Sequence, residues 1–308
     1  MKKRLFCSIA IIMLATLLLL PLQVYAANPI DTSHACSLQL EYSTSQTAFP
    51  NLSISLYRVA DYFSDGTWKL SGDFANYPVN IHGITSQTEW AQVTSTLFAY
   101  ASADHLQPMR QGTTDTSGHL LFEDLTPGMY LIPGYSAENS SGTWQFDAFL
   151  VLLPHPAEEG PHLYDVTAKP KCSQFTPTPE QIQLTVVKHW RDAGYENSRP
   201  ASVTVDILNN GQVVMTQQLN QENNWTFSWD TLNDGSVWQV VERNVPSGYT
   251  VTVSQTGNSF LLTNTHPGGV IHPPQTGDPV VLWPYLLIMS ISGCALLLLG
   301  LHRRRLTR

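Results

Sequence analysis

Short runs of alternating apolar and polar residues fill most of the chain between residues 36 and 172. A period of two sends successive side chains to opposite faces of a strand. The runs are separated by turn-forming pairs such as Asp65-Gly66, Ser117-Gly118 and Pro127-Gly128. The pattern predicts a first β-sandwich domain over residues 36–172.

One segment of this domain, residues 86–103, has a helical period instead. Trp90, Val93, Leu97 and Tyr100 follow one another at three- and four-residue steps. This spacing places the four side chains on one face of a helix. We therefore predict a short amphipathic helix inserted between strands.

A second series of strands follows a polar stretch. Residues 173–181 contain Pro177 and Pro179 and lack an apolar period, which is typical of a semi-rigid linker. Alternation then resumes over residues 182–265, with hairpin-type turns such as Asn209-Asn210-Gly211. The length suits a second sandwich of about seven strands.

The amino terminus has the pattern of a secretory signal peptide. Three basic residues precede a long uncharged run that ends at Ala26. We predict a signal peptide over residues 1–26, removed after the small residue. An uncleaved amino-terminal anchor is the alternative.

The carboxyl-terminal region predicts a membrane helix. Residues 266–274 are rich in Gly and Pro and predict a flexible stalk. Residues 280–301 carry no charge and, as a helix, would span roughly 33 Å, enough for a bilayer core. Four arginines in residues 302–308 favour a cytoplasmic tail, which places everything before the helix outside the cell.

The charge of the predicted mature region, residues 27–276, excludes nucleic acid as a partner. Nine Lys and Arg stand against 23 Asp and Glu, a net charge of −14. Such an acidic surface repels phosphate backbones. This region contains four lysines: Lys69, Lys169, Lys171 and Lys188.

Two of the four cysteines fall outside the predicted signal peptide and membrane helix. Cys36 and Cys172 stand at the two ends of the first domain, in the oxidising exterior. Such a pair favours a disulfide, which would close a long loop and stabilise the fold by roughly 4–5 kcal/mol on a chain-entropy model. Two unpaired thiols are the alternative.

Alternation places three polar residues on the apolar faces of strands in the second domain. Lys188 shares a strand face with the apolar Leu184 and Val186. On two later strands, Glu242 and Asn264 likewise share a face with apolar residues. An isolated buried charge costs several kcal/mol, so we expect the three polar side chains to meet. A buried ion pair with a hydrogen-bonded asparagine is one interpretation.

A covalent bond is the other interpretation. Burial shifts a Lys–Glu pair toward the neutral amine and the protonated acid. The amine of Lys188 could then attack the side-chain amide of Asn264 while Glu242 moves the proton, releasing ammonia. The product would be an intramolecular isopeptide bond.

The residues around this trio resemble a known family. Motifs 187–190, 223–225, 238–242, 246–249 and 262–265 are similar to the collagen-binding-protein B-type (Cna-B) domain. The resemblance implies a reverse-Ig or prealbumin-like sandwich in which Lys188 and Asn264 form the bond and Glu242 catalyses it. The fold class expected for the chain is therefore all-β, with two tandem immunoglobulin-like sandwiches.

The first domain resembles the amino-terminal domains of pilins. Residues 114–131 look like the turn and hairpin of that family, and residues 164–171 are similar to the pilin motif. The resemblance implies that Lys171 accepts the sortase-linked end of the next subunit. The chain departs from the motif at Lys169, where tyrosine is usual, and at His162, where tryptophan is usual.

Residues 273–278 resemble a sortase sorting signal. The residues are Pro273, Pro274, Gln275, Thr276, Gly277 and Asp278, so Pro273 replaces the usual leucine. The resemblance implies cleavage between Thr276 and Gly277 and transfer of Thr276 to an amine. A plain linker before a permanent membrane anchor is the alternative.

These patterns favour a structural surface protein over an enzyme. The sequence contains no metal-ligand spacing, nucleophile elbow or phosphate-binding loop, so neither a metal nor a cofactor is expected. The expected partners are sortase, the membrane before sorting, and a peptidoglycan precursor or neighbouring pilin subunits. The function predicted is a wall-anchored pilus subunit, shaft or basal; the alternative is a monomeric adhesin for a host or matrix ligand.

Overall fold

The structure, a computed structural model, describes residues 30–45, 47–63, 67–139, 142–157 and 161–269. The predicted signal peptide, sorting motif, membrane helix and basic tail lie outside these residues. Within the described part of the chain, no helix combines the length and apolar character needed to cross a bilayer. The described residues form mainly β-strands, as the alternation predicts.

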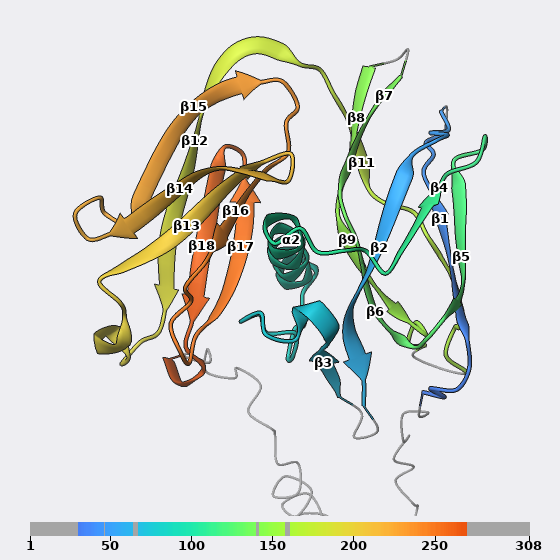
Figure 1. The fold of residues 1–308 in the computed structure, drawn as a ribbon, viewed down its shortest axis with the longest axis horizontal. Helices are drawn as coiled ribbons and strands as arrows, with labels where there is room; N and C mark the ends of the chain where they lie inside the picture. Colours follow the sequence, from blue (N-terminus) through green and yellow to red (C-terminus); the bar gives the residue numbers. More distant parts are fainter. Residues whose placement is uncertain (1–29, 46, 64–66, 140–141, 158–160, 270–308) are drawn as a thin grey trace, which may run out of the picture.

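Eleven strands and one α-helix build the first half of the described chain (Figure 1). Strands β10, β1 and β5 form one sheet, β3, β2, β6 and β9 form a second with β4 paired to β2, and β11, β8 and β7 form a third. The strands are β1 (Cys36–Glu41), β2 (Ser53–Tyr62), β3 (Trp68–Leu70), β4 (Arg110–Thr113), β5 (His119–Leu125), β6 (Gly128–Ile132), β7 (Tyr135–Asn139), β8 (Gly142–Phe146), β9 (Phe149–Leu153), β10 (Asp165–Ala168) and β11 (Cys172–Phe175).

Seven strands build the second half as a two-layer sandwich. One sheet has the order β15-β12-β18-β17 and the other β14-β13-β16. The first and last strands, β12 and β18, are neighbours and run parallel. The strands are β12 (Thr178–Arg191), β13 (Ser202–Asn209), β14 (Gln212–Asn220), β15 (Thr226–Asn233), β16 (Trp238–Glu242), β17 (Thr250–Thr256) and β18 (Ser259–Thr265).

The predicted helix is confirmed as α2 (Gln87–Ala103). Its first turn is fixed by a capping box, in which the Ser86 hydroxyl accepts from the Glu89 N–H and the Glu89 carboxylate accepts from the Ser86 N–H. The described residues also contain three short 3-10 turns: η1 (Gly72–Phe74), η2 (Glu196–Ser198) and η3 (Pro267–Gly269).

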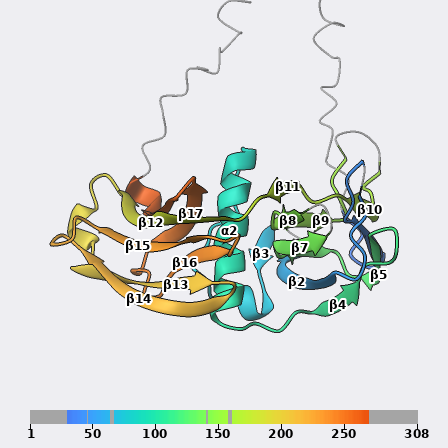
Figure 2. The same cartoon turned by 90° about the horizontal axis from the view of Figure 1, so that it is seen from above.

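Helix α2 lies between the two sandwiches, as the two views show (Figures 1 and 2). Although it belongs to the first half of the chain, it packs against β16 and β17 of the second sandwich. Its buried residues join one hydrophobic cluster with residues of the second sandwich. A separate cluster fills the first sandwich.

The segment predicted as a linker, residues 173–181, differs from the expectation. Its first residues belong to β11, which pairs with β8, and its last residues begin β12. Pro179 has no N–H to donate, but the pairing of β12 with β15 shifts register between Thr178 and Gln181 and so accommodates it. Thus only Thr176 and Pro177 separate the two strands.

Candidate functional site: a buried lysine, glutamate and asparagine

Lys188 points into the second sandwich, as the alternation predicts. It lies on β12 between the buried Val186 and the half-buried Trp190, and its side chain has no exposed surface. The Nζ atom donates to the backbone carbonyls of Leu262 at 3.3 Å and His189 at 3.2 Å. It also lies 4.3 Å from the centre of the Trp190 ring.

Glu242 and Asn264 meet Lys188 in this interior. The Glu242 Oε2 atom is 3.4 Å from Lys188 Nζ, and the Glu242 side chain is fully buried. The Asn264 Nδ2 group donates to Glu242 Oε1 at 2.8 Å, while Asn264 Oδ1 has no hydrogen-bond partner among the described residues. The carboxylate therefore contacts both the amine and the amide.

The topology explains why these three residues converge. Lys188 and Asn264 lie on the adjacent parallel strands β12 and β18, where Lys188 is opposite Leu262 and Asn264 is opposite Trp190. Residues two apart on a strand share a face, so both side chains enter the same side of the sheet. Glu242, on β16 of the other sheet, reaches them across the core.

Burial shifts both charged groups toward their neutral forms. Desolvation lowers the pKa of Lys188 to about 8, although the nearby Glu242 carboxylate opposes the change. Desolvation also raises the pKa of Glu242, opposed by Lys188 and by the hydrogen bond from Asn264. Near neutral pH, part of the lysine can thus exist as a nucleophilic amine beside the Glu242 carboxyl group.

A second group of polar residues lies near Lys188. Asp192, buried at the end of β12, accepts from the Arg199 guanidinium at 2.6 and 2.8 Å and from the Tyr249 hydroxyl at 2.9 Å. The Arg199 guanidinium lies 5.6 Å from the centre of the Trp190 ring. Sequence reasoning missed Asp192 because it follows β12, where alternation no longer defines a face.

Lys171 lies away from this site, on the surface of the first sandwich. Its side chain is exposed, just before β11, and its carbonyl accepts from the Asp147 N–H at 3.0 Å. It lines a cleft of about 740 Å³ formed by β9, β10 and the start of α2. The position is accessible to another protein.

The predicted disulfide between Cys36 and Cys172 is not formed in the structure, where both cysteines are free. Cys36 is buried, Cys172 is half-buried, and both belong to the cluster that fills the first sandwich. Burial raises the pKa of the Cys36 thiol to about 11, which disfavours the thiolate that disulfide exchange requires. In this structure Cys36 and Cys172 are side chains packed in or against the core of the first sandwich.

Among the described residues, no group of three His, Cys, Asp or Glu side chains is arranged to hold a metal ion. The sorting-motif residues Pro273, Pro274, Gln275, Thr276 and Gly277 lie outside the described part. Of the residues singled out from the sequence, the structure brings together Lys188, Glu242 and Asn264.

Comparison with known proteins identifies the second sandwich. Residues 184–265 match the family model of the Cna protein B-type domain, which confirms the resemblance seen in the sequence. A collagen adhesin of Staphylococcus aureus is 29% identical over 113 residues, which cover 33% of this chain and 10% of the adhesin. The chain thus matches about a tenth of that relative's length.

Solved structures similar to the chain include surface repeats and pilins. A B repeat unit of the collagen binding surface protein of Staphylococcus aureus is 15% identical in sequence, with a TM-score of 0.26. The match covers 76% of this chain and 98% of the repeat-unit chain. The major pilin SpaD from Corynebacterium diphtheriae is 12% identical in sequence, with a TM-score of 0.29. The match covers 77% of this chain and 67% of the pilin chain.

Proposed function

We propose that this chain is a structural surface protein of the cell wall, in which Lys188 and Asn264 become joined by an isopeptide bond. The observation that carries the proposal is the contact of the buried Glu242 carboxylate with both Lys188 Nζ and Asn264 Nδ2. The match of residues 184–265 to the Cna protein B-type domain supports the same function.

The reaction needs no group beyond the three side chains. The neutral amine of Lys188 attacks the Asn264 side-chain carbonyl carbon, forming a C–N bond. Glu242 takes the proton that the amine loses and gives a proton to the departing Nδ2, which leaves as ammonia. One amide is exchanged for another, so the carboxyl group ends in its starting form.

The bond would join the first and last strands of the second sandwich. Because β12 and β18 are parallel neighbours, pulling on the two ends of the domain loads this strand pair directly. A covalent link within the pair prevents the chain between Lys188 and Asn264 from extending. This property suits a protein that bears load outside the cell.

The first test is the mass of the purified protein. We expect the chain containing both sandwiches to weigh about 17 Da less than its sequence mass, the loss of one ammonia in the stated chemistry. Fragmentation should give one branched peptide that carries both Lys188 and Asn264. A full sequence mass after prolonged incubation at pH 8 would contradict the proposal.

Anchoring forms the second part of the proposal. In it, sortase cleaves the membrane-bound precursor between Thr276 and Gly277 and transfers Thr276 to an amine of a peptidoglycan precursor or of another subunit. The sequence of motif, apolar segment and basic tail supports this order of events. The mature protein would then be covalently displayed on the wall.

Lys171 decides between a pilus shaft subunit and other wall proteins. Its exposed amine beside a cleft supports attachment of a neighbouring subunit there. We expect wall-released protein to yield a branched peptide joining Thr276 to Lys171, and Lys171→Arg to remove the high-mass ladder in electrophoresis. Lys69→Arg, which changes a lysine on β3, is the matched control and should keep the ladder.

A monomeric adhesin remains the second candidate function. The observation that favours it is the similarity of one third of this chain to a collagen adhesin. In that case, Thr276 would be found on peptidoglycan alone, and the Lys171→Arg protein would run like the wild type.

A further inference from the structure

Both edge strands of the second sandwich that face α2 would be open without it. In their sheets, β16 pairs only with β13 and β17 pairs only with β18. An edge strand presents unpaired N–H and C=O groups to its surroundings. Three backbone groups on this side of the sandwich are bonded instead by residues from the first half of the chain.

Three hydrogen bonds make this closure. The Tyr100 hydroxyl donates to the Glu242 backbone carbonyl at 2.9 Å. The Val253 N–H donates to the Thr96 hydroxyl at 2.8 Å, and the Val251 N–H donates to the Pro78 carbonyl at 2.8 Å. Pro78, Thr96 and Tyr100 all precede β4 in the chain. Thr96 and Tyr100 lie one helical turn apart on α2. The helix thus bonds one strand of each sheet.

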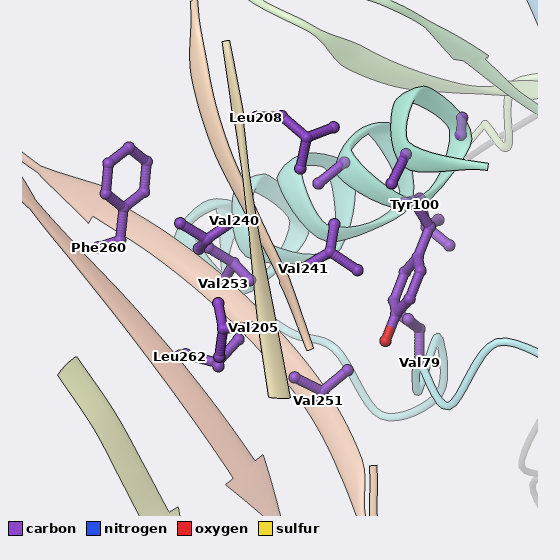
Figure 3. Packing of buried hydrophobic residues seen from close by; sticks show 14 of the residues in the cluster. Val79, Tyr100, Val205, Leu208, Val240, Val241, Val251, Val253, Phe260 and Leu262 are labelled. Atoms are coloured by element: carbon purple, nitrogen blue, oxygen red, sulfur yellow. The ribbon is translucent and has the colours of Figure 1, made fainter. Parts of the chain in front are cut away.

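Apolar side chains also pack between α2 and the edge strands β16 and β17. Figure 3 shows Val251 and Val253 of β17 and Val240 of β16 in the space beside α2, with Val79 near Tyr100. All of these residues are buried. The interior that holds Lys188 and Glu242 is therefore closed on this side by a helix from the other sandwich.

The hydrogen bond from Tyr100 is made to Glu242 itself, at the end of β16. Glu242 is the last residue of β16, and the next residue, Arg243, donates its N–H to Thr204 on β13. Because backbone groups alternate in direction along an antiparallel pair, the Glu242 carbonyl points away from β13, toward the open edge. Tyr100 supplies a partner for this carbonyl, and it is buried.

Charged groups hold the same junction at its surface. The Arg243 guanidinium bridges Asp104, just after α2, and Asp206 of β13. The ring of Tyr77 stacks on Tyr100 with 4.3 Å between centres, and its hydroxyl donates to Asp104 at 2.6 Å. The carboxyl-terminal end of α2 is thus linked to the end of β16, which immediately precedes Arg243.

We propose that the first half of the chain controls the cross-link of the second: docking of α2 closes the reaction site, and Tyr100 is a positioning residue for Glu242. This inference rests on the proposed isopeptide bond. Exclusion of water by α2 keeps Lys188 desolvated and so supplies the neutral amine. Cross-linking is then conditional on folding and docking of the first sandwich.

The test is the rate of ammonia loss in the freshly refolded chain containing both sandwiches, followed by intact mass from pH 6 to 10. Tyr100→Phe keeps the ring and removes the hydroxyl. We expect about tenfold slower cross-linking, equal to roughly 1.4 kcal/mol, the worth of one buried hydrogen bond. We also expect the midpoint of its rate–pH curve to move above the wild-type value. Water that reaches Lys188 solvates the charged amine and so raises the pKa that desolvation lowers.

Tyr62→Phe is the matched control, since it removes a tyrosine hydroxyl from β2, outside the contact between α2 and the second sandwich, and its rate should stay within about twofold of the wild type. Thr96→Val should slow the reaction like Tyr100→Phe. A Tyr100→Phe protein with the wild-type rate and midpoint overturns the inference. So does a rate lowered equally at every pH, because that result means only a smaller folded fraction.

The outcome also separates this inference from the function on which it rests. If the wild-type chain loses no ammonia, the isopeptide bond itself is wrong, and the control by α2 falls with it. If the wild type reacts and the α2 variants react equally well, only the inference about α2 is wrong.

Discussion

Replacing Glu242 with alanine is expected to abolish the isopeptide bond, leaving the protein at its full sequence mass. The carboxyl group is the one acid in contact with both Lys188 and Asn264 in the described structure, and without it neither proton transfer has a carrier. Breaking a buried ion pair also leaves Lys188 unpaired, which costs about 3–5 kcal/mol. Intact mass spectrometry and urea unfolding measure the two effects separately.

Two further variants separate chemistry from stability. Glu242→Gln keeps the size and a hydrogen-bonding side chain but cannot carry the proton, so it should fold better than the alanine variant and still lack the bond. Glu222→Ala, which changes an exposed glutamate of the same sandwich, should cross-link like the wild type. A Glu242→Gln protein that loses ammonia at the wild-type rate would show that another group moves the proton.

The trio could be found from the sequence because strands obey a strict period of two. Lys188 falls among Leu184, Val186 and Trp190 on the inner face of β12, and the structure buries it there. On β16 the same reasoning was incomplete. Strict alternation turns Gln239 and Val241 away from the sandwich interior that Val240 and Glu242 face, yet both are buried.

The missing information was tertiary. Helix α2 is separated from β16 by most of two sandwiches along the chain, and its apolar face gave no sign of whether it would cover its own domain or the next. Tyr100 looked like one more residue of that face, although its hydroxyl bonds to the carbonyl of Glu242. The linker prediction failed for a similar reason, since Ser173 and Gln174 gain their strand partners from β8.

The second large effect concerns stability in a chain that cannot cross-link. Asn264→Ala removes the amide and leaves Lys188 as a buried titratable amine. The pKa of Lys188 is about 8 in the folded protein and 10.5 as the ordinary value, so between these pH values the unfolded chain binds more protons than the folded one. The free energy of unfolding must therefore rise with pH across this window.

The expected gain is at most about 1.4 kcal/mol per pH unit, or roughly 3 kcal/mol between pH 8 and 10.5. Urea titrations of Asn264→Ala at several pH values measure it. The double variant Lys188→Met with Asn264→Ala is the control, because every other titrating group is shared and only the buried amine is gone. The wild type should behave like this control, since an amide nitrogen does not titrate in this range. If all three proteins show the same pH dependence, Lys188 does not become a desolvated amine in the folded state, and the nucleophile that the cross-link requires is absent.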